Sequence, residues 1–76
     1  MPLAFIFINA EVGSEQEVVK ELRKIESVKE AYVVYGVHDV VAKVEAETTD
    51  KLREAITRKV RKVNKIRSTL TMTVIK

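Results

Sequence analysis

The sequence predicts an α+β fold of the ferredoxin-like type, with its elements in the order β-α-β-β-α-β. Three observations lead to this prediction. A strand-length segment that is apolar on both faces opens the chain, residues 14–26 and 50–63 have helical amphipathic spacing, and three further strand patterns separate or follow them. This order builds a four-stranded antiparallel sheet with two helices on one face. The 76 residues are predicted to form one domain, residues 1–76.

The first strand pattern runs from Leu3 to Val12 and is apolar on both parities. One parity carries Leu3, Phe5 and Phe7, and the other carries Ala4, Ile6, Ile8 and Ala10. A strand with two apolar faces is covered on both of them, so we expect it in the middle of the sheet. Gly13 then breaks the pattern.

The first helix is predicted over residues 14–26. Ser14 and Glu17 have the spacing of a capping box, in which the serine hydroxyl accepts from the amide three residues on. Apolar residues follow at helical spacing, and charged residues occupy the other positions. The apolar positions are Val18, Val19, Leu22 and Ile25.

A hairpin is predicted next. Val28 to Tyr35 is rich in β-branched and aromatic residues, which are typical of strands. Residues 35–39 form a turn in which Gly36 can adopt a positive φ. The segment 40–47 then alternates small apolar residues with residues that are mostly polar, as in a strand with one semi-polar face.

The second helix is predicted over residues 50–63, after the N-cap oxygens of residues 48–50. Its apolar face consists of Leu52, Ala55, Ile56, Val60 and Val63. The last strand, 66–75, alternates apolar residues with threonines. Because both β-α-β crossovers are right-handed, we expect the first and last strands to lie in the middle of the sheet.

The sheet face opposite the helices is predicted to pack against a second copy, which gives an α/β sandwich. On a single copy this face would expose one apolar side of the first strand, and exposed apolar patches usually mark interfaces. A chain of this size also buries a small core, and it has no cysteine to crosslink it. A homodimer is therefore expected.

Composition excludes several classes of protein. With 46% hydrophobic and 33% charged residues, the chain is neither disordered nor a membrane protein, and its longest apolar run, Pro2 to Ile8, is too short to span a bilayer. The absence of cysteine and of a secretory signal predicts a cytoplasmic protein. The scarcity of Asn and Gln beside many charges suggests a thermophilic source.

Charge is distributed asymmetrically. Residues 1–50 carry five basic and ten acidic residues, a net charge of −5, whereas residues 51–76 carry nine basic residues and one acidic residue, a net charge of +8. The basic helix 50–63 has three interpretations: a solvated outer face, a phosphate-binding surface, or a surface that docks on the acidic first helix of a neighbouring subunit.

Catalysis and metal binding have little support. There is no Cys, His38 is the only histidine, and neither Ser14, Ser27 nor Ser68 lies in a recognisable nucleophile motif. His38 and Asp39 would supply two ligands where zinc needs three or four. We therefore predict no enzyme activity, metal or cofactor.

The RNA-recognition motif shares the predicted topology, but the third strand here lacks the aromatic residues on which that module stacks bases.

The chain resembles the effector-binding (RAM) domain of the Lrp/AsnC transcription regulators along its whole length. The resemblance rests on the strand Ala31–Tyr35 running into Gly36-Val37-His38-Asp39, where the family has Gly-x-Tyr-Asp, and on the Thr69-Leu70-Thr71 segment of the last strand. His38 replaces the family's aromatic residue. Typical members carry a helix-turn-helix domain before this module, and this chain begins directly in the first strand. The resemblance therefore implies a stand-alone effector domain without sequence-specific DNA binding.

The resemblance further implies dimers joined through their sheet faces, rings such as octamers or decamers, and amino-acid effectors bound in clefts between dimers. The ligand-binding residues would be Gly36, Val37, His38, Asp39, Thr69 and Thr71, contributed by neighbouring subunits. Backbone amides after Gly36 would donate to the ligand carboxylate, Asp39 would accept from its ammonium group, and the threonine hydroxyls could do either. An ordinary hairpin turn and ordinary strand propensity remain the alternatives for these residues.

Regulation would then be indirect, through ligand-dependent assembly or co-assembly with full-length regulators. Four other functions remain open: a structural adaptor without ligand, a sequence-independent nucleic-acid binder that uses the basic helix, an amino-acid-binding domain of the ACT type, and a small enzyme, which ranks last.

Overall fold

The strand β1 (Leu3–Ala10) lies at the centre of the computed structural model, which describes residues 1–75. It pairs antiparallel with β3 (Val40–Glu45) on one side and with β4 (Ile66–Thr73) on the other. β2 (Val28–Val33) pairs antiparallel with β3, so the strand order is β2-β3-β1-β4. The ferredoxin-like fold and the central position of β1 are confirmed.

The prediction that the last strand is also central is wrong. β3 is the second central strand and β4 forms an edge. The second crossover carries the chain over β1 to the open side of the sheet, because β3 already occupies the place between β1 and β2. The side chains agree with this order: Val40, Ala42 and Val44 of β3 are buried, whereas Thr71 of β4 is exposed.

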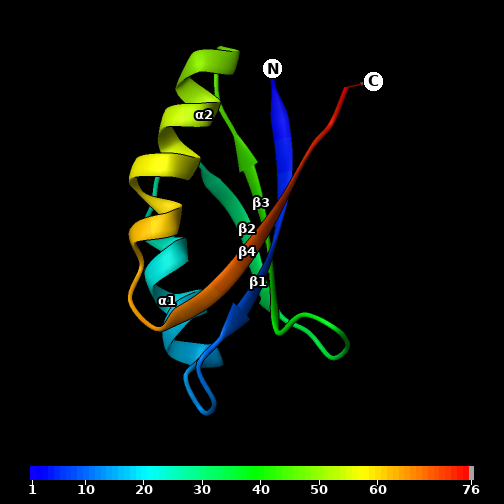
Figure 1. Cartoon of the computed structure of the whole chain (residues 1–76). Helices are drawn as coiled ribbons and strands as arrows, with labels where there is room; N and C mark the ends of the chain where they lie inside the picture. Colours follow the sequence, from blue (N-terminus) through cyan, green and yellow to red (C-terminus); the bar gives the residue numbers. More distant parts are fainter. Residues whose placement is uncertain (76) are drawn as a thin grey trace.

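Two helices cover one face of the sheet (Figure 1). α1 spans Glu15–Arg23 and α2 spans Thr49–Arg58, followed by a short 3-10 turn over Val60–Lys62. The predicted helix over residues 50–63 is therefore interrupted at Lys59, and the tighter turn keeps Val60 fully buried. Thr48 caps α2 as predicted, since its hydroxyl accepts a hydrogen bond from the amide of Lys51 at 3.1 Å.

The capping box predicted for α1 does not form. Ser14 precedes the helix, but its side chain makes no capping hydrogen bond. Its backbone amide donates to the Glu11 oxygen at 2.9 Å in the turn around Gly13, and its ψ of 6° differs from the extended conformation of Thr48 at the start of α2. An N-cap hydroxyl reaches the first turn from the extended backbone region, so this turn geometry prevents the bond.

The core lies between the helices and the covered sheet face. Alternate residues of β1 and β3 contribute aliphatic side chains to it, and the helices contribute Val18, Leu22, Leu52 and Ile56. On β1 the alternation is complete: Ala4, Ile6 and Ile8 are fully buried. Burial of each large aliphatic side chain contributes about 1.5–3 kcal/mol, which makes this layer the main source of stability.

Candidate functional site

The sheet face opposite the helices is apolar and has no covering element within residues 1–75 (Figure 1). Strand register places Tyr32, Val41, Phe7 and Leu70 in one row across all four strands of this face. Met72 lies beside Phe5 in the next row. Tyr32 is 49% exposed, Leu70 45% and Met72 53%, so the sequence prediction of an open apolar face is confirmed for a single copy. We call these residues, together with Leu3, the open face.

A loop over residues 34–39 joins β2 to β3 and projects away from the helix layer (Figure 1). Gly36 has a φ of +145°, which only glycine adopts readily. A Cβ built at this position would meet no atom within 4 Å, so the backbone conformation, and not the available space, requires glycine here. Tyr35 and Val37 on either side are almost fully exposed.

Asp39 makes three hydrogen bonds, two of which anchor this loop to β1. Its backbone amide donates to the oxygen of Ile8 at 3.0 Å, and its backbone oxygen accepts from the amide of Val34 at 2.8 Å. Its side-chain Oδ2 accepts from the amide of Ala10 at 3.1 Å. The carboxylate reaches across to β1 and does not bond the backbone of its own turn, as the alternative of an ordinary hairpin turn would have it.

His38 packs on the open face and not into the loop. Its ring centroid lies 5.5 Å from that of Phe7, with the planes tilted by 40°. The residue is half-buried, and its Nδ1 atom is buried without a hydrogen-bond partner within residues 1–75. The sequence could not show which way His38 points. The structure places it at the border between the loop and the open face.

A cleft of about 430 Å³ lies where the loop meets the end of β1 and the beginning of β4. It is lined by Asn9, Val37, Asp39, Arg67 and Ser68. Asn9 and Ser68 face each other across the strand pair, and the Asn9 amide Nδ2 donates to the Ser68 hydroxyl at 3.0 Å. Asp39 and Arg67 form no ion pair with each other within the described chain. The cleft therefore presents an anion and a cation at separate points.

Two of these five cleft residues, Val37 and Asp39, were predicted from the sequence as ligand-binding residues. Gly36 and His38 belong to the same loop but do not line the cleft. Asn9 could have been noticed as the polar residue that ends the parity of Leu3, Phe5 and Phe7. Arg67 and Ser68 immediately precede Thr69, but their approach to the loop depends on the register of β4 with β1.

The two predicted threonines lie elsewhere in a single copy. Register places Thr69 beside Ile8 and Thr71 beside Ile6, on the helix-covered side of the sheet. Thr71 lines a groove of about 340 Å³ between β4 and α2, together with residues that include Arg53 and Arg61. One copy therefore does not bring Thr71 to the cleft of Asp39. That neighbouring subunits bring these threonines next to Asp39 stays a prediction.

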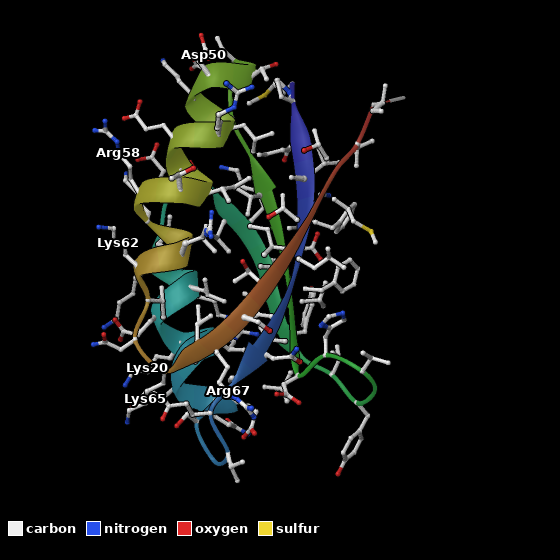
Figure 2. The ribbon with its side chains drawn as sticks, viewed as in Figure 1. Lys20, Asp50, Arg58, Lys62, Lys65 and Arg67 are labelled. Atoms are coloured by element: carbon white, nitrogen blue, oxygen red, sulfur yellow. The ribbon has the colours of Figure 1, made fainter. Side chains whose placement is uncertain are left out.

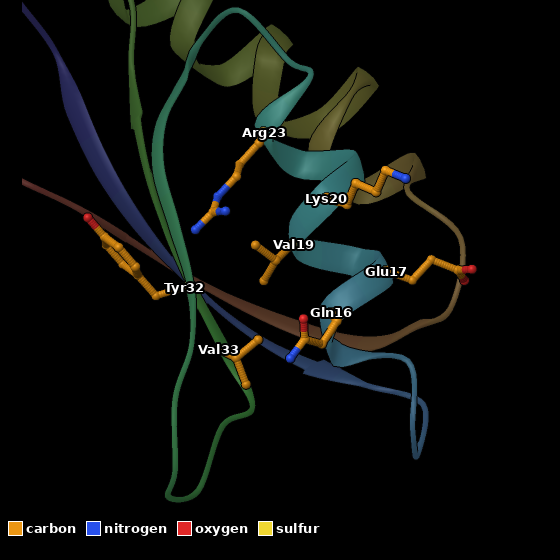
Figure 3. A pocket seen from close by; sticks show the side chains of 7 residues that line it. All are labelled: Gln16, Glu17, Val19, Lys20, Arg23, Tyr32 and Val33. Atoms are coloured by element: carbon orange, nitrogen blue, oxygen red, sulfur yellow. The ribbon is translucent and has the colours of Figure 1, made fainter.

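A second groove, of about 610 Å³, separates α1 from β2, the other edge of the sheet. Figure 3 shows Val19 and Arg23 of α1 pointing towards β2, whereas Glu17 points away. The Arg23 guanidinium donates to the backbone oxygen of Ala31 from Nε at 3.2 Å and from Nη2 at 2.7 Å. Arg23 thus occupies an acceptor of the β2 edge that could otherwise pair with another strand.

A polar cluster lies on the β2 side of the open face. The Tyr32 hydroxyl donates to Glu30 Oε1 at 2.7 Å, and Lys43 Nζ lies 3.5 Å from Glu30 Oε2. The hydrogen bond from Tyr32 lowers the pKa of Glu30, with a further contribution from the Lys43 charge. The same hydrogen bond, together with the Glu30 charge, raises the pKa of Tyr32.

The described residues contain neither a metal-binding cluster nor a helix that could cross a membrane. Within residues 1–75 no group of three or more His, Cys, Asp or Glu side chains is placed to hold a metal ion. Neither helix in this part of the chain is long and apolar enough to cross a membrane.

Comparison with known proteins adds to this geometry. The family model of the Lrp/AsnC ligand-binding domain matches residues 3–76. An uncharacterized HTH-type transcriptional regulator of Pyrococcus abyssi, PYRAB01370, is 38% identical over 69 residues, which cover 91% of this chain and 44% of the relative. The chain thus spans less than half the length of this curated relative.

Solved structures share the fold. The hypothetical protein PHS023 from Pyrococcus horikoshii superposes with a TM-score of 0.93 at 45% identity, covering all of this chain and 92% of the other. The transcriptional regulator NMB0573 from Neisseria meningitidis, solved as a complex with L-Met, superposes with a TM-score of 0.83 over 99% of this chain and 50% of its own. At 14% identity, this second likeness shows the fold alone.

Proposed function

The chain belongs to the Lrp/AsnC ligand-binding domain family, and on this premise we propose that it is an oligomeric, non-enzymatic module that binds a free amino acid. The observation that carries this proposal is the placement of Asp39 and Arg67 in one cleft without an ion pair between them. A zwitterionic ligand brings one charge for each of these side chains. The L-Met complex of the Neisseria regulator supports the choice of ligand class.

The polar groups of the cleft suit this ligand. The Arg67 guanidinium can donate two parallel hydrogen bonds to a carboxylate. Asp39 uses Oδ2 for the Ala10 amide, and its Oδ1 makes no hydrogen bond within residues 1–75, so it can accept from an ammonium group. Asn9 and Ser68 add an amide and a hydroxyl at the cleft wall. Selectivity among amino acids would depend on the contacts that the ligand side chain makes with Val37 and with a neighbouring subunit.

The open face supports assembly. Its apolar residues would leave water if two copies packed sheet against sheet, at about 25 cal/mol for each Å² of apolar surface removed. His38 and Phe7 would then lie at the border of that interface, next to the ligand loop. The loop projects beyond the sheet, where a neighbouring dimer could supply Thr69 or Thr71 and so complete the predicted site in a ring.

Ligand binding would favour the assembly that completes the cleft. The module would act in the cytoplasm by changing its own assembly. Because the curated relatives are longer regulators, it could also co-assemble with full-length proteins of the family. This regulation would be indirect.

Thermal-shift measurements against each of the twenty amino acids, at several protein concentrations, test the proposal. At least one amino acid should raise the midpoint of unfolding, since a ligand that binds only the folded state stabilises it. Arg67→Gln should abolish that response. Arg58→Gln removes an exposed arginine of α2 that does not line the groove of Thr71, and it should leave the response intact. A structural adaptor without ligand would respond to none of the twenty.

A further inference from the structure

A strongly basic surface on the helix layer plays no part in the proposed ligand site. Between residues 51 and 67 the chain has eight basic residues and a single acidic one, Glu54. Two of the eight are paired: Lys51 with Glu47 at 3.4 Å, and Lys65 with Glu17 at 2.7 Å. The others on α2 and the following turn are exposed and form no ion pair within the described chain. These residues, which we call the basic face, are Arg53, Arg58, Lys59, Arg61 and Lys62.

The fold turns this face away from the sheet. Leu52, Ile56 and Val60 are buried against the core, which directs the charged positions between them outward. Figure 2 shows Arg58 and Lys62 along the outer side of the helix layer. The face would therefore remain accessible if two copies packed through their open faces.

The first helix of a second copy is a poor partner for this surface. α1 contains Glu15, Glu17 and Glu21, but it also contains Lys20 and Arg23, so three acidic residues against two basic ones leave a net charge of only −1. Two of its acidic residues already have partners: Glu17 binds Lys65, and Glu21 binds Lys24 at 3.0 Å. The docking interpretation of the basic helix therefore has little charge complementarity to support it.

The basic face also lacks the features of a protein interface. Apolar and aromatic anchors usually supply most of the energy at such interfaces. Here the apolar residues of α2 are buried, and all four aromatic residues lie elsewhere: Phe5, Phe7 and Tyr32 on the sheet, and Tyr35 in the loop. A partner recognised by charge alone is a polyanion. Without exposed aromatic rings the face has no stacking platform for unpaired bases.

We propose that the basic face binds the phosphate backbone of duplex DNA without sequence preference. The basic face extends from Arg53 to Lys62 over about 15 Å, at a rise of about 1.5 Å per residue in α2 and about 2.0 Å in the 3-10 turn, which is close to four base-pair steps of about 3.4 Å. Three or four phosphates per copy lie within that span. Release of their counterions makes the affinity fall about 40- to 150-fold between 50 and 200 mM salt.

Fluorescence anisotropy of a labelled 20-base-pair duplex of arbitrary sequence, titrated with the full chain at 50, 100 and 200 mM NaCl, tests this proposal. The double variant Arg58→Ala/Lys62→Ala should weaken binding at least about tenfold at 50 mM and flatten the salt slope by nearly two. Lys29→Glu changes the net charge by the same amount on β2, in the sheet layer, and should bind nearly as the unmodified chain does. Circular dichroism and gel filtration establish that both variants keep fold and assembly.

Several results would overturn the proposal. They are the absence of binding at 50 mM salt, an equal loss in Lys29→Glu, and tighter binding to the single strand or to an RNA duplex of the same sequence. Equal binding to poly-glutamate at matched charge would instead assign the face to acidic proteins. A second duplex of unrelated sequence should bind within about twofold, because phosphate contacts carry no base information.

Discussion

The carboxylate of Asp39 accepts a hydrogen bond from the backbone amide of Ala10 at 3.1 Å and so joins the β2–β3 loop to the end of β1. The same residue is proposed to bind the ligand ammonium through its other oxygen. The structural role of Asp39 and its proposed recognition role can be separated by the choice of substitution.

Asp39→Asn should retain most of the stability and lose the amino-acid response. The asparagine oxygen can still accept from the Ala10 amide, but the negative charge is gone. Asp39→Ala leaves that amide without its partner and should cost about 1–2 kcal/mol in the free energy of unfolding. Urea denaturation with and without the amino acid measures both effects. Equal destabilisation by Asn and Ala would show that the hydrogen bond depends on the charge.

The two helix N-termini should respond differently to loss of their hydroxyls. Thr48→Ala removes a hydroxyl that caps α2 and should destabilise the chain by about 1 kcal/mol. Ser14→Ala removes a hydroxyl without a capping bond, so its effect should lie within about 0.5 kcal/mol of zero. Denaturation midpoints of the two variants, measured side by side, make the comparison. A larger loss in Ser14→Ala would contradict the geometry described for α1.

Leu70→Asp should dissociate the proposed homodimer. It places a charge beside Phe7, at the β4 end of the row across the open face, where an interface would have to desolvate it. Val12→Asp, at an exposed apolar residue in the β1–α1 turn, is the matched control and should leave the assembly unchanged. Sedimentation velocity at micromolar concentration measures both. An unmodified chain that sediments as a monomer would already refute sheet-face packing.

The Tyr32–Glu30 hydrogen bond should appear in the titration of the tyrosine. In a Tyr35→Phe background Tyr32 is the only tyrosine that titrates by ultraviolet absorbance. Glu30→Gln should lower the pKa of Tyr32, because the hydrogen bond to Glu30 is the main cause of its raised value. No change in the pKa would show that the bond does not persist in solution.

The same pair affects stability at both ends of the pH scale. The lowered pKa of Glu30 means that its contribution is present above the unfolded-state value of about 4.3 and is lost as pH falls through the folded pKa. The raised pKa of Tyr32 means that its contribution is present below about 10 and is lost as pH rises through the folded value. Both contributions are small because the groups are exposed.

Local patterns were sufficient for the element order and for the central position of β1. Both alternating sets of side chains in Leu3–Ala10 are apolar, which is evident from neighbouring residues alone, and the same holds for the hairpin around Gly36. The order of the other strands depends on pairing between distant segments. The threonine face of β4, compared with the aliphatic face of β3, was the available sign that β4 lies at an edge.

The candidate site was only partly predictable for the same reason. Val37 and Asp39 belong to a loop whose sequence is distinctive, whereas Asn9, Arg67 and Ser68 reach the cleft through the register of β1 with β4. The cap at Ser14 was predicted from the spacing of Ser14 and Glu17 alone. The backbone hydrogen bond from Ser14 to Glu11, which belongs to the turn that prevents the cap, does not enter such a prediction.

Calorimetric titration of one responding amino acid and its two blocked derivatives tests the recognition of a zwitterion most directly. The free amino acid should bind, while its N-acetyl derivative loses the charge that Asp39 recognises and its carboxamide loses the charge that Arg67 recognises. Both blocked compounds should bind at least about tenfold more weakly, the equivalent of 1.4 kcal/mol. If either derivative bound as tightly as the free amino acid, the assignment of the Asp39–Arg67 cleft would be contradicted.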